Sequence, residues 1–542
     1  MQTQITVTVL PQEEKNQKLV EKKLFSELSK NQIKTQGHKV SFVFGKKSID
    51  ARRGQLKIHL KYNVYIDEEP KDAATSELAK WKKADGTATG GKIRTVVIIG
   101  SGPAGLFAAL RLLQDGIKPV IIERGQETHQ RKIDIAKIST QKLVNPDSNY
   151  CFGEGGAGTF SDGKLYTRSN KRGNINKSLQ IFAHFGADSK ILTDAHPHIG
   201  TEKLPGVINA MRDFIIQMGG EFYFNTRCVD FIIEEKKVCG AVCCNTTSGE
   251  QFEVRGEAVI LATGHSANDI YELLAHKAPS SLEAKTFAMG VRVEHPRTLI
   301  DNIQFHGKTE GMAAAEYRLV TQVEERGVYS FCMCPGGFVV PSSTAPDQIV
   351  VNGMSASGRN SQWSNAAIVV ETRPEDIPET FIKQAEEKGT PALAGLLFRT
   401  WLEQKTKEQG DGQKAPSQRL TDFLSHKDTA ELPKSSYTPG LVTSRLDQWL
   451  PEHIEKRLEQ GFFNFDKNMK GFISQDAILI ASETRTSTPV RIVRDTESLE
   501  SSALKGLYPC GEGSGYSGGI VSSAMDGEKV AQKIAEKLLQ EK

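Results

Sequence analysis

The sequence predicts an α/β protein built around a parallel β-sheet, with an inserted α+β domain and a small β-α-β-β domain at the N-terminus. Two apolar runs, at 94–100 and 118–123, enclose a helical pattern, which is typical of a parallel β-α-β unit. Strict alternation of apolar residues at 56–66 predicts a separate, half-buried strand. The mixed region 265–480 is too long for a loop, which indicates an inserted domain.

The N-terminal domain is expected over residues 1–70. Its predicted elements are a strand around Ile5 to Val9, an amphipathic helix at 13–28, a strand at 38–44 and a strand at 56–66. Residues 71–93 are charged and contain three glycines, so they are predicted to be a linker. The basic stretch 46–53 is interpreted as a solvated hairpin, with contact to an anionic partner as the alternative.

The composition excludes several classes of protein. The chain has 542 residues, of which 38% are hydrophobic and 25% charged, so it is neither disordered nor collagen-like. The net charge of +3 does not by itself indicate nucleic-acid binding. Neither a membrane-spanning apolar run nor a signal peptide is apparent. Eight cysteines without a secretion signal suggest free thiols and a cytoplasmic location.

The strongest motif is a GxGxxG directly after the first apolar run, from Gly100 to Gly105. Gly100 permits the tight turn, Gly102 lets a pyrophosphate approach the backbone, and Gly105 allows close packing of helix and strand. The phosphates would lie at the helix N-terminus, together with Pro103 and Ala104. Glu123 ends the second strand, where a carboxylate can accept hydrogen bonds from ribose. The sequence therefore predicts a dinucleotide site.

The later order of elements indicates which dinucleotide. A run of strands ends in Ala262-Thr263-Gly264, and a glycine-rich turn at 511–519 opens a helix that ends near 540. The expected domain is thus split into 94–264 and 481–542. This order resembles the FAD-binding domain of the glutathione-reductase-like flavoproteins. The resemblance implies a non-covalent FAD, with the 262–264 segment beside its adenosine and the late turn beside its isoalloxazine.

A narrower resemblance rests on the segment FGEGGAGTFSDGKL at 152–165. Further motifs keep their order along the chain: KKSIDARR at 46–53, HIGT at 198–201, ATGHS at 262–266, CMCPGG at 332–337, NGMS at 352–355, ETRTS at 483–487, GEG at 511–513 and GYSGGI at 515–520. Together they are similar to the uncharacterised FAD-dependent dehydrogenases. The resemblance covers nearly the whole chain, and it implies a Rossmann-like fold and a flavin-dependent redox activity.

Glycines in the 153–164 segment suit a flavin cradle, because backbone N–H groups can approach a ring edge or a phosphate there. Ser161 and Asp162 are expected to bind ribityl hydroxyls, and Lys164 to offset negative charge on a reduced flavin. A glycine-rich surface loop is the alternative. The remaining cofactor-binding residues that we expect are Arg124, Gly155, Gly156, Thr159, Phe160, Gly163, Val229, Gly511, Glu512, Ser517, Gly518, Gly519 and Ile520.

No catalytic residue stands out from the sequence alone. The candidates, besides Lys164, are His198 as a proton donor and Arg359 and Arg485 as clamps for an anionic group, against the alternatives of a loop histidine and surface arginines. The C-x-C of Cys332 and Cys334 is interpreted as packing, so neither disulfide chemistry nor a metal site is expected.

The function that we expect is transfer of hydride or electrons between flavin N5 and a substrate under the inserted domain. No second β-α-β fingerprint occurs in that domain, so NADH or NADPH, if it is the donor, would bind transiently. The alternative is an FAD-dependent protein that modifies or binds RNA. An NAD-only dehydrogenase and a protein with a purely structural FAD also remain open.

Overall fold

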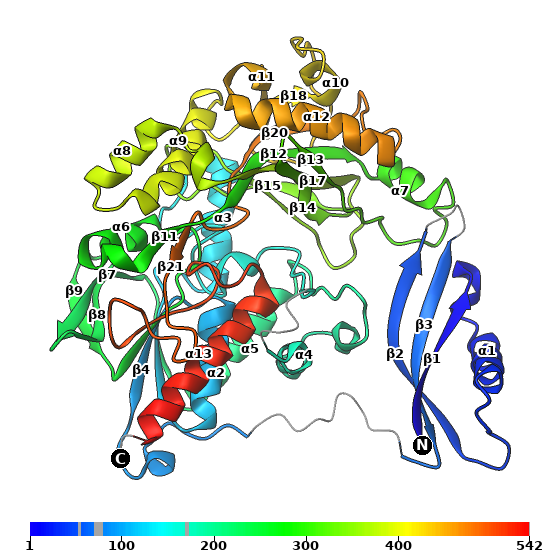
Figure 1. Ribbon diagram of the computed structural model, residues 1–542, viewed down its shortest axis with the longest axis horizontal. Coiled ribbons are helices and arrows are strands. Elements are labelled where there is room, and N and C mark those ends of the chain that lie inside the picture. Colours follow the sequence, from blue (N-terminus) through cyan, green and yellow to red (C-terminus); the bar gives the residue numbers. More distant parts are fainter. Residues whose placement is uncertain (52–55, 70–79, 168–172, 541–542) are drawn as a thin grey trace.

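The computed structural model describes residues 1–51, 56–69, 80–167 and 173–540. Within these ranges the chain forms a small N-terminal unit and a large body, which lie side by side in Figure 1. The N-terminal unit meets the body beside α7 (Arg297–Phe305), where His306 Nε2 lies 3.1 Å from the carbonyl oxygen of Ala51. Among the described residues, no helix combines the length and the apolar character needed to cross a membrane.

The N-terminal unit has the predicted β-α-β-β order. Its elements are β1 (Gln2–Val9), α1 (Gln17–Lys30), β2 (Val40–Asp50) and β3 (Lys57–Ile66), and the strands form an antiparallel sheet in the order β1-β3-β2. Val20, Leu24 and Leu28 of α1 pack on apolar residues of β1 and β3, which gives the unit a core of its own.

One predicted boundary in this unit needs correction. The helix begins at Gln17 rather than at 13, because Asn16 caps it by accepting a hydrogen bond from the N–H of Leu19. The stretch 46–50 is the end of strand β2, which pairs antiparallel with β3, and Lys46, Ser48 and Ile49 are exposed, so it agrees with the predicted solvated hairpin. Lys47 is ion-paired with Glu14. The rest of that stretch, 52–53, lies outside the described residues.

The body contains the predicted parallel sheet. Its five strands stand in the order β22 (Leu507–Pro509), β10 (Ala258–Leu261), β4 (Thr95–Ile99), β5 (Lys118–Ile122) and β6 (Glu221–Tyr223). On one face, α2 (Pro103–Gln114), α4 (Ile175–His184), α5 (Leu204–Gln217) and α13 (Ile520–Gln540) cover Val96 and Ile98. On the other face, Val97 and Ile99 contact the strand meander.

The meander consists of β7 (Thr226–Glu234), β8 (Lys237–Asn245) and β9 (Gln251–Arg255), which pair antiparallel. Residues 221–234 are divided between two strands, because the chain turns at Asn225, which has a φ of 51°. The residues before this turn join the parallel sheet as β6, and those after it form β7. The body also contains α3 (Thr128–Gln141), α6 (Asn268–Lys277), and the antiparallel pair β11 (Leu282–Ala284) and β21 (Val490–Ile492).

The inserted region is built on a seven-stranded sheet. Its order is β13 (Val320–Val323), β14 (Arg326–Cys334), β17 (Trp363–Thr372), β12 (Phe287–Pro296), β20 (Ile478–Glu483), β18 (Ala415–Arg419) and β19 (Leu441–Thr443). Around this sheet lie β15 (Phe338–Pro341), β16 (Val351–Met354), α8 (Glu379–Glu387), α9 (Ala394–Glu408), α10 (Leu420–Phe423), α11 (Leu446–Trp449) and α12 (Glu452–Asn468). The predicted boundary at residue 480 falls inside β20, so the insert extends further; the other domain boundaries stay predictions.

The second half of the expected linker is packed on the body. The ring of Trp81 lies 5.0 Å from that of Phe214 between centroids, and the N–H of Lys82 donates to the carbonyl of Leu113 at 2.8 Å. Ala84 is buried. Composition alone did not reveal these contacts, because one aromatic residue anchors an otherwise charged segment. Residues 70–79 lie outside the described part of the chain.

Candidate functional site

A cavity of about 410 Å³ opens where the inserted sheet faces the carboxyl ends of the parallel strands. Its wall includes the loop after β4, the ends of β5 and β10, the glycine-rich segment 156–164 and the turn before α13. The inserted domain contributes Phe331, Cys332, Asn352 and Gly353. Both parts of the body therefore line one continuous space, at the strand ends where open α/β sheets bind ligands.

The glycines after β4 are explained by close backbone contacts. Gly100 has a φ of 107°, and a Cβ there would lie 2.4 Å from the carbonyl oxygen of Ala262. A Cβ at Gly105 would lie 2.0 Å from the carbonyl oxygen of Gly100. Gly102 differs, because the nearest neighbour of a Cβ there would be the Cα of Gly156 at 3.8 Å. It caps α2 without a side chain, so the first amides of the helix face open space.

Glu123 is buried at the end of β5, and its carboxylate accepts hydrogen bonds from other residues of the protein. Oε2 accepts hydrogen bonds from the N–H and Oγ of Ser101 at 3.0 and 2.7 Å, and Oε1 accepts from the N–H groups of Gly125 and Gly153, both at 3.0 Å. These four bonds use the acceptor capacity of an ionised carboxylate. Glu123 thus ties the GxGxxG turn to the segment at 153. A ribose hydroxyl would have to replace one of these donors.

The 153–164 segment is held by Arg131, a buried residue of α3 that the sequence did not single out. Its guanidinium donates to the carbonyls of Asn149 at 2.9 Å, Tyr150 at 3.0 Å and Glu154 at 2.7 Å. Gly153 has a φ of 117°, and a Cβ there would lie 2.3 Å from Cδ of Arg131. The glycine-rich loop is therefore built around one arginine instead of being a surface loop.

Lys164 lies at the cavity wall within a group of charges. Its Nζ is 3.5 Å from Oδ2 of Asp162, and Asp162 also accepts a hydrogen bond from Arg359 Nη2 at 3.0 Å. Arg359 is further ion-paired with Glu316. Asp162 Oδ1 is buried without a hydrogen-bond partner in the described structure, so an acceptor remains available beside the cavity.

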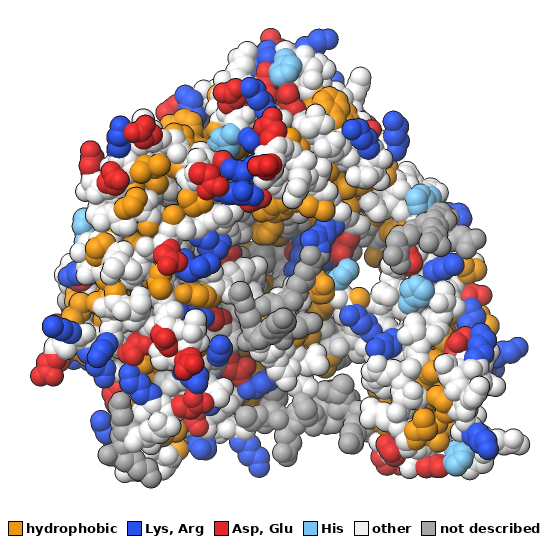
Figure 2. Space-filling model, viewed as in Figure 1, with side chains coloured by type: hydrophobic (Ala, Val, Ile, Leu, Met, Phe, Trp, Pro, Cys, Tyr) orange, Lys and Arg blue, Asp and Glu red, His pale blue; other side chains and the backbone are white. Residues whose placement is uncertain are grey.

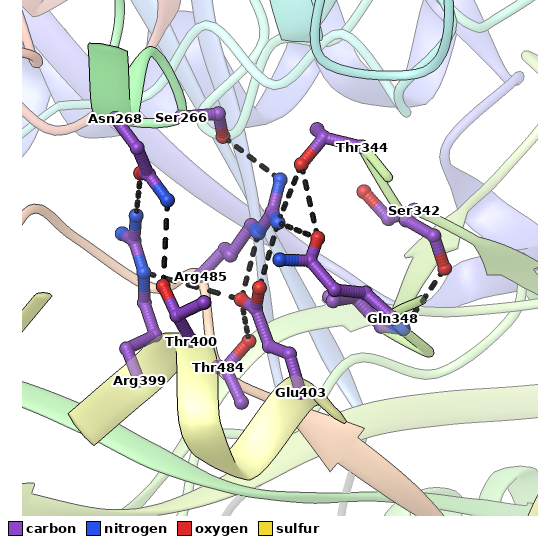
Figure 3. A network of polar contacts seen from close by, with 12 residues as sticks. Ser266, Asn268, Ser342, Thr344, Gln348, Arg399, Thr400, Glu403, Thr484 and Arg485 are labelled. Carbon is purple, nitrogen blue, oxygen red and sulfur yellow. Dashed lines mark hydrogen bonds and ion pairs between the residues drawn. The ribbon is translucent and has the colours of Figure 1, made fainter. Parts of the chain in front are cut away.

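Arg485 is buried at the cavity wall and lies at the centre of the network in Figure 3. Its guanidinium binds Glu403 of α9 twice, with Nε–Oε1 at 2.9 Å and Nη2–Oε2 at 2.8 Å. It also donates to Thr344 at 2.7 Å and to Ser266 at 3.3 Å. Arg485 is therefore neither a surface arginine nor a free clamp, because its donors already bind protein groups.

His265 holds the same region in place. Nε2 lies 2.9 Å from the carbonyl oxygen of Arg485, and burial lowers the pKa of the imidazole to about 4, with the charge of Arg399 as a further cause. The ring is therefore neutral near pH 7, and the hydrogen bond runs from Nε2–H to the carbonyl. This agrees with a positioning role directly after the predicted 262–264 segment.

The turn before α13 is fixed by Asp526, which lies in the second turn of that helix. Its Oδ2 accepts from the N–H of Gly511 at 2.8 Å, and its Oδ1 is 2.6 Å from Nη2 of Arg494. Glu512 follows at the cavity wall. Burial raises the pKa of Glu512 to about 7, with the charge of Lys285 opposing the shift.

The cavity wall contains most, but not all, of the expected residues. Those at the wall are Gly100, Gly102, Pro103, Ala104, Glu123, Arg124, Gly156, Phe160, Ser161, Asp162, Gly163, Lys164, Ala262, Thr263, Gly264, Arg485, Gly511, Glu512, Gly518, Gly519 and Ile520. Those elsewhere are Gly105, Gly155, Thr159, Val229, Ser517, His198 and Arg359.

For two of the residues that do not line the cavity, the structure gives a clear reason. Val229 is the unpaired residue at an irregularity of β7, between Cys228, which pairs with Cys243, and Asp230, which pairs with Val242; Cys228 lines the cavity instead. His198 Nε2 lies 3.4 Å from the carbonyl oxygen of Ser357, which corresponds to the loop-histidine alternative. Wall residues that the sequence did not indicate include Tyr150, Cys151, Thr226 and Phe331. Their positions depend on contacts between distant segments, so no local pattern marked them.

Comparison with known proteins identifies the chain. Residues 94–278 match the model of the pyridine nucleotide-disulphide oxidoreductases, and 286–486 match that of the FAD-dependent protein C-terminal domain. Residues 1–65 match a domain of unknown function. An uncharacterised protein of Clostridium beijerinckii is 40% identical over 509 residues, which are 91% of this chain and 92% of that protein. The chain belongs to the FAD-dependent oxidoreductases.

Solved flavoproteins are more distant. A flavoprotein/dehydrogenase of Cytophaga hutchinsonii shares 10% identity, with 82% of this chain and 78% of that chain covered and a TM-score of 0.37. A geranylgeranyl bacteriochlorophyll reductase-like protein of Thermoplasma acidophilum shares 13% identity over 83% of this chain and 82% of that chain, with a TM-score of 0.33.

The cavity of this FAD-dependent oxidoreductase fits its cofactor. The open approach at Gly102 leaves room for a pyrophosphate at the positive end of α2, and the buried unpartnered oxygen of Asp162 can accept a hydroxyl hydrogen bond. The start of α13 presents a second helix N-terminus to the cavity through Gly518 and Gly519. The expected absence of a metal site stays a prediction: among the described residues, His426, Glu455 and Glu459 bring possible ligand atoms within 4.8 Å of one another.

Proposed function

We propose that the enzyme binds FAD along the wall formed by the parallel sheet and reduces or oxidises a substrate that enters under the inserted domain. The observation that carries this proposal is the shared cavity, because residues of both parts of the body line it. FAD would supply hydride and electron transfer. The chain would bind it, orient it and keep water from the reacting face.

Different residues at the cavity wall would bind different parts of FAD. Gly102 and the first turn of α2 would hold the pyrophosphate, and Ser161 and Asp162 the ribityl hydroxyls. Burial alone would lower the pKa of Lys164, but the nearby Cys332, Cys334 and Asp162 outweigh this effect and raise it, so the amine stays protonated. A fixed ammonium beside the cavity favours negative charge on whatever occupies it.

NADH or NADPH would be a transient donor in this proposal. The described strand pairs of the seven-stranded sheet are antiparallel except for β18 with β19, so the insert does not supply a second parallel nucleotide-binding sheet. A nicotinamide would therefore share the cavity with the substrate. Direct reduction of the flavin by the substrate is the other route.

The test is the visible spectrum of the purified protein as NADH or NADPH is added without oxygen. A two-banded yellow spectrum that bleaches would support the proposal and identify the donor. A yellow spectrum that only dithionite bleaches would point to the substrate as donor. A protein that is colourless and takes up no added FAD would overturn the proposal, and an NAD-only dehydrogenase would then be favoured.

RNA binding or modification is the second candidate, and it has less support. Figure 2 shows Lys and Arg side chains mixed with Asp and Glu over most of the visible face. Lys47, part of the basic stretch that suggested an anionic partner, is ion-paired within the N-terminal unit. Salt-dependent retention on an anionic resin would favour this candidate, because binding to a polyanion weakens with salt.

We further propose a cytoplasmic location, which rests on the cysteines. All eight are free thiols, and six of them lie on strands β7, β8 and β14. Free thiols persist in a reducing compartment. Fractionation of cells that express the protein would test this.

A further inference from the structure

Cys332 and Cys334 lie at an irregularity of strand β14. Phe331 pairs with Ala367 and Cys334 pairs with Asn365, so two residues of β14 stand opposite one residue of β17. This is a β-bulge, and Cys332 within it has a φ of 44°. Bulges redirect side chains, and residues with positive φ are uncommon outside glycine. The packing interpretation from the sequence does not explain this conformation.

The bulge brings both sulfur atoms to one cation. Lys164 Nζ lies 3.9 Å from Sγ of Cys332 and 4.0 Å from Sγ of Cys334. The Cys334 thiol also lies 3.3 Å from the carbonyl oxygen of Cys332. On the other side, Arg292 Nη1 donates to that carbonyl at 3.4 Å. The pair is therefore held between two positive groups. The nearby acidic groups are Asp162, beside Lys164, and Glu483, which is 2.9 Å from Arg292; Glu512 is also close enough for Cys332 to raise its pKa.

The two cysteines differ in access. Cys332 is half-buried and lines the cavity, whereas Cys334 is fully buried and does not line it. The hydrogen bond from the Cys334 thiol lowers the pKa of Cys332 well below its ordinary value, with Lys164 and Arg292 as further causes; the same bond and burial raise the pKa of Cys334. By contrast, burial raises the pKa of Cys228, which also reaches the cavity wall.

We propose that Cys332 and Cys334 form a redox-active dithiol that reduces disulfides entering the cavity, with Cys332 as the attacking sulfur and Cys334 as the resolving one. A nucleophile at the wall and a second thiol two residues further along the strand, both within 4.0 Å of one ammonium group, are what such a reaction requires. This inference rests on the proposed function, because it names a disulfide as the substrate class of the same cavity.

The steps balance without a further reactant. The Cys332 thiolate attacks one sulfur of the incoming disulfide, so an S–S bond forms to Cys332 and the other half leaves as a thiolate. Cys334 then gives its proton to the thiolate that left first and attacks Sγ of Cys332. This attack forms the intramolecular disulfide, breaks the mixed disulfide and releases the second half as a thiolate. The substrate gains two electrons, and the cysteine pair loses two.

The experiment uses the full-length protein, reduced and then incubated without oxygen with glutathione disulfide as the probe. Iodoacetamide traps the remaining thiols, and mass spectrometry reads the tryptic peptide 327–359, which contains both of these cysteines and no other. We expect a 332–334 disulfide in the wild type. C334S should accumulate a glutathione adduct on Cys332, and C332S should react at least tenfold more slowly at this peptide.

The matched control is C244S, because Cys244 is half-buried on β8 and does not line the cavity; it should behave as the wild type. In K164M, alkylation of Cys332 by iodoacetamide should require a higher pH than in the wild type, because the charge that stabilises the thiolate is gone. A lysine with only a structural role would not shift this pH. A pair that stays reduced in the wild type, or adducts confined to other cysteines, would overturn the inference. The flavin spectrum distinguishes the two proposals. If the flavin can be bleached but Cys332 and Cys334 do not react, only the dithiol proposal is refuted. If the two cysteines react but the protein binds no flavin, only the proposed function is refuted.

Discussion

Gly102 and Gly105 belong to the same motif but have different structural roles. A Cβ at Gly105 would collide with the carbonyl oxygen of Gly100, so that glycine serves packing of α2 on β4. Gly102 has a φ of −70°, which any residue adopts, and has no close neighbour. Its lack of a side chain is therefore useful only toward the cavity.

We accordingly expect G102A to keep the stability of the apoprotein within about 0.5 kcal/mol and to weaken FAD binding at least ~10-fold, or ~1.4 kcal/mol. Thermal unfolding and titration of the apoprotein with FAD would measure the two quantities. G206A is the matched control, because a methyl group at Gly206 would have no neighbour within 4 Å and this residue does not line the cavity. Unchanged FAD affinity in G102A would show that the pyrophosphate does not bind at this turn.

Glu512 gives the site a pH dependence. Burial raises its pKa to about 7 in the folded protein, from the ordinary 4.5. Since the folded state then binds the proton more tightly, the stabilisation is fully present below pH 4.5 and is lost as the pH rises through 7. The stability of the apoprotein relative to E512Q should fall over that interval, by at most about 3 kcal/mol. Urea unfolding of both proteins at a series of pH values across that interval would show it, and a constant difference would contradict the assignment.

At the scale of elements, α9 joins the inserted domain to the cavity through one ion pair. Glu403 of α9 and Arg485, which follows β20, are both buried, and Thr484 donates to the same carboxylate at 2.7 Å. Removing one member of a buried pair leaves the other charge without compensation. The pair therefore fixes where the end of β20 meets the cavity wall.

E403Q should lower the free energy of unfolding by about 3 kcal/mol, as measured by urea denaturation. The control is E408Q on the same helix, since Glu408 is 63% exposed and pairs only with Lys405 in the described structure. Its effect should stay below about 1 kcal/mol. Equal effects of the two substitutions would show that the buried pair contributes no more than a surface one.

At the scale of the whole molecule, the N-terminal unit is separate from the cavity. Its own apolar core joins α1 to β1 and β3, and the described wall residues all lie at 99 or beyond. The unit touches the body through the contact between Ala51 and His306, through the backbone bridge of Lys47 with Asp194, and through Leu56, which is buried against the body's core. These contacts position the unit without forming the cavity.

A chain that begins at residue 80 should therefore bind FAD within about twofold of the full-length affinity, or ~0.4 kcal/mol. Fluorescence titration of both proteins would test this, with far-ultraviolet circular dichroism as the check on folding. Loss of FAD binding in a folded truncated protein would show that the N-terminal unit acts on the cavity.

The elements with local signals could be predicted from the amino-acid sequence. The period of two at 56–66, the buried runs of β4 and β5, and the glycines around α2 each predict a conformation from neighbouring residues alone. The order of the glycine-rich segments was sufficient for the family and the cofactor. Twenty-one of the predicted site residues line the cavity for this reason.

The contacts between side chains of separate segments could not be predicted in this way, because they depend on the folded arrangement of the chain. Arg131, Glu403 and Asp526 hold the cavity wall through partners that lie 23, 82 and 15 residues away, and no spacing in the sequence predicts these pairs. The same holds for the C-x-C motif, which meets Lys164 across 168 residues. A buried charge is stable only with a partner, and the fold alone determines which partner comes within reach.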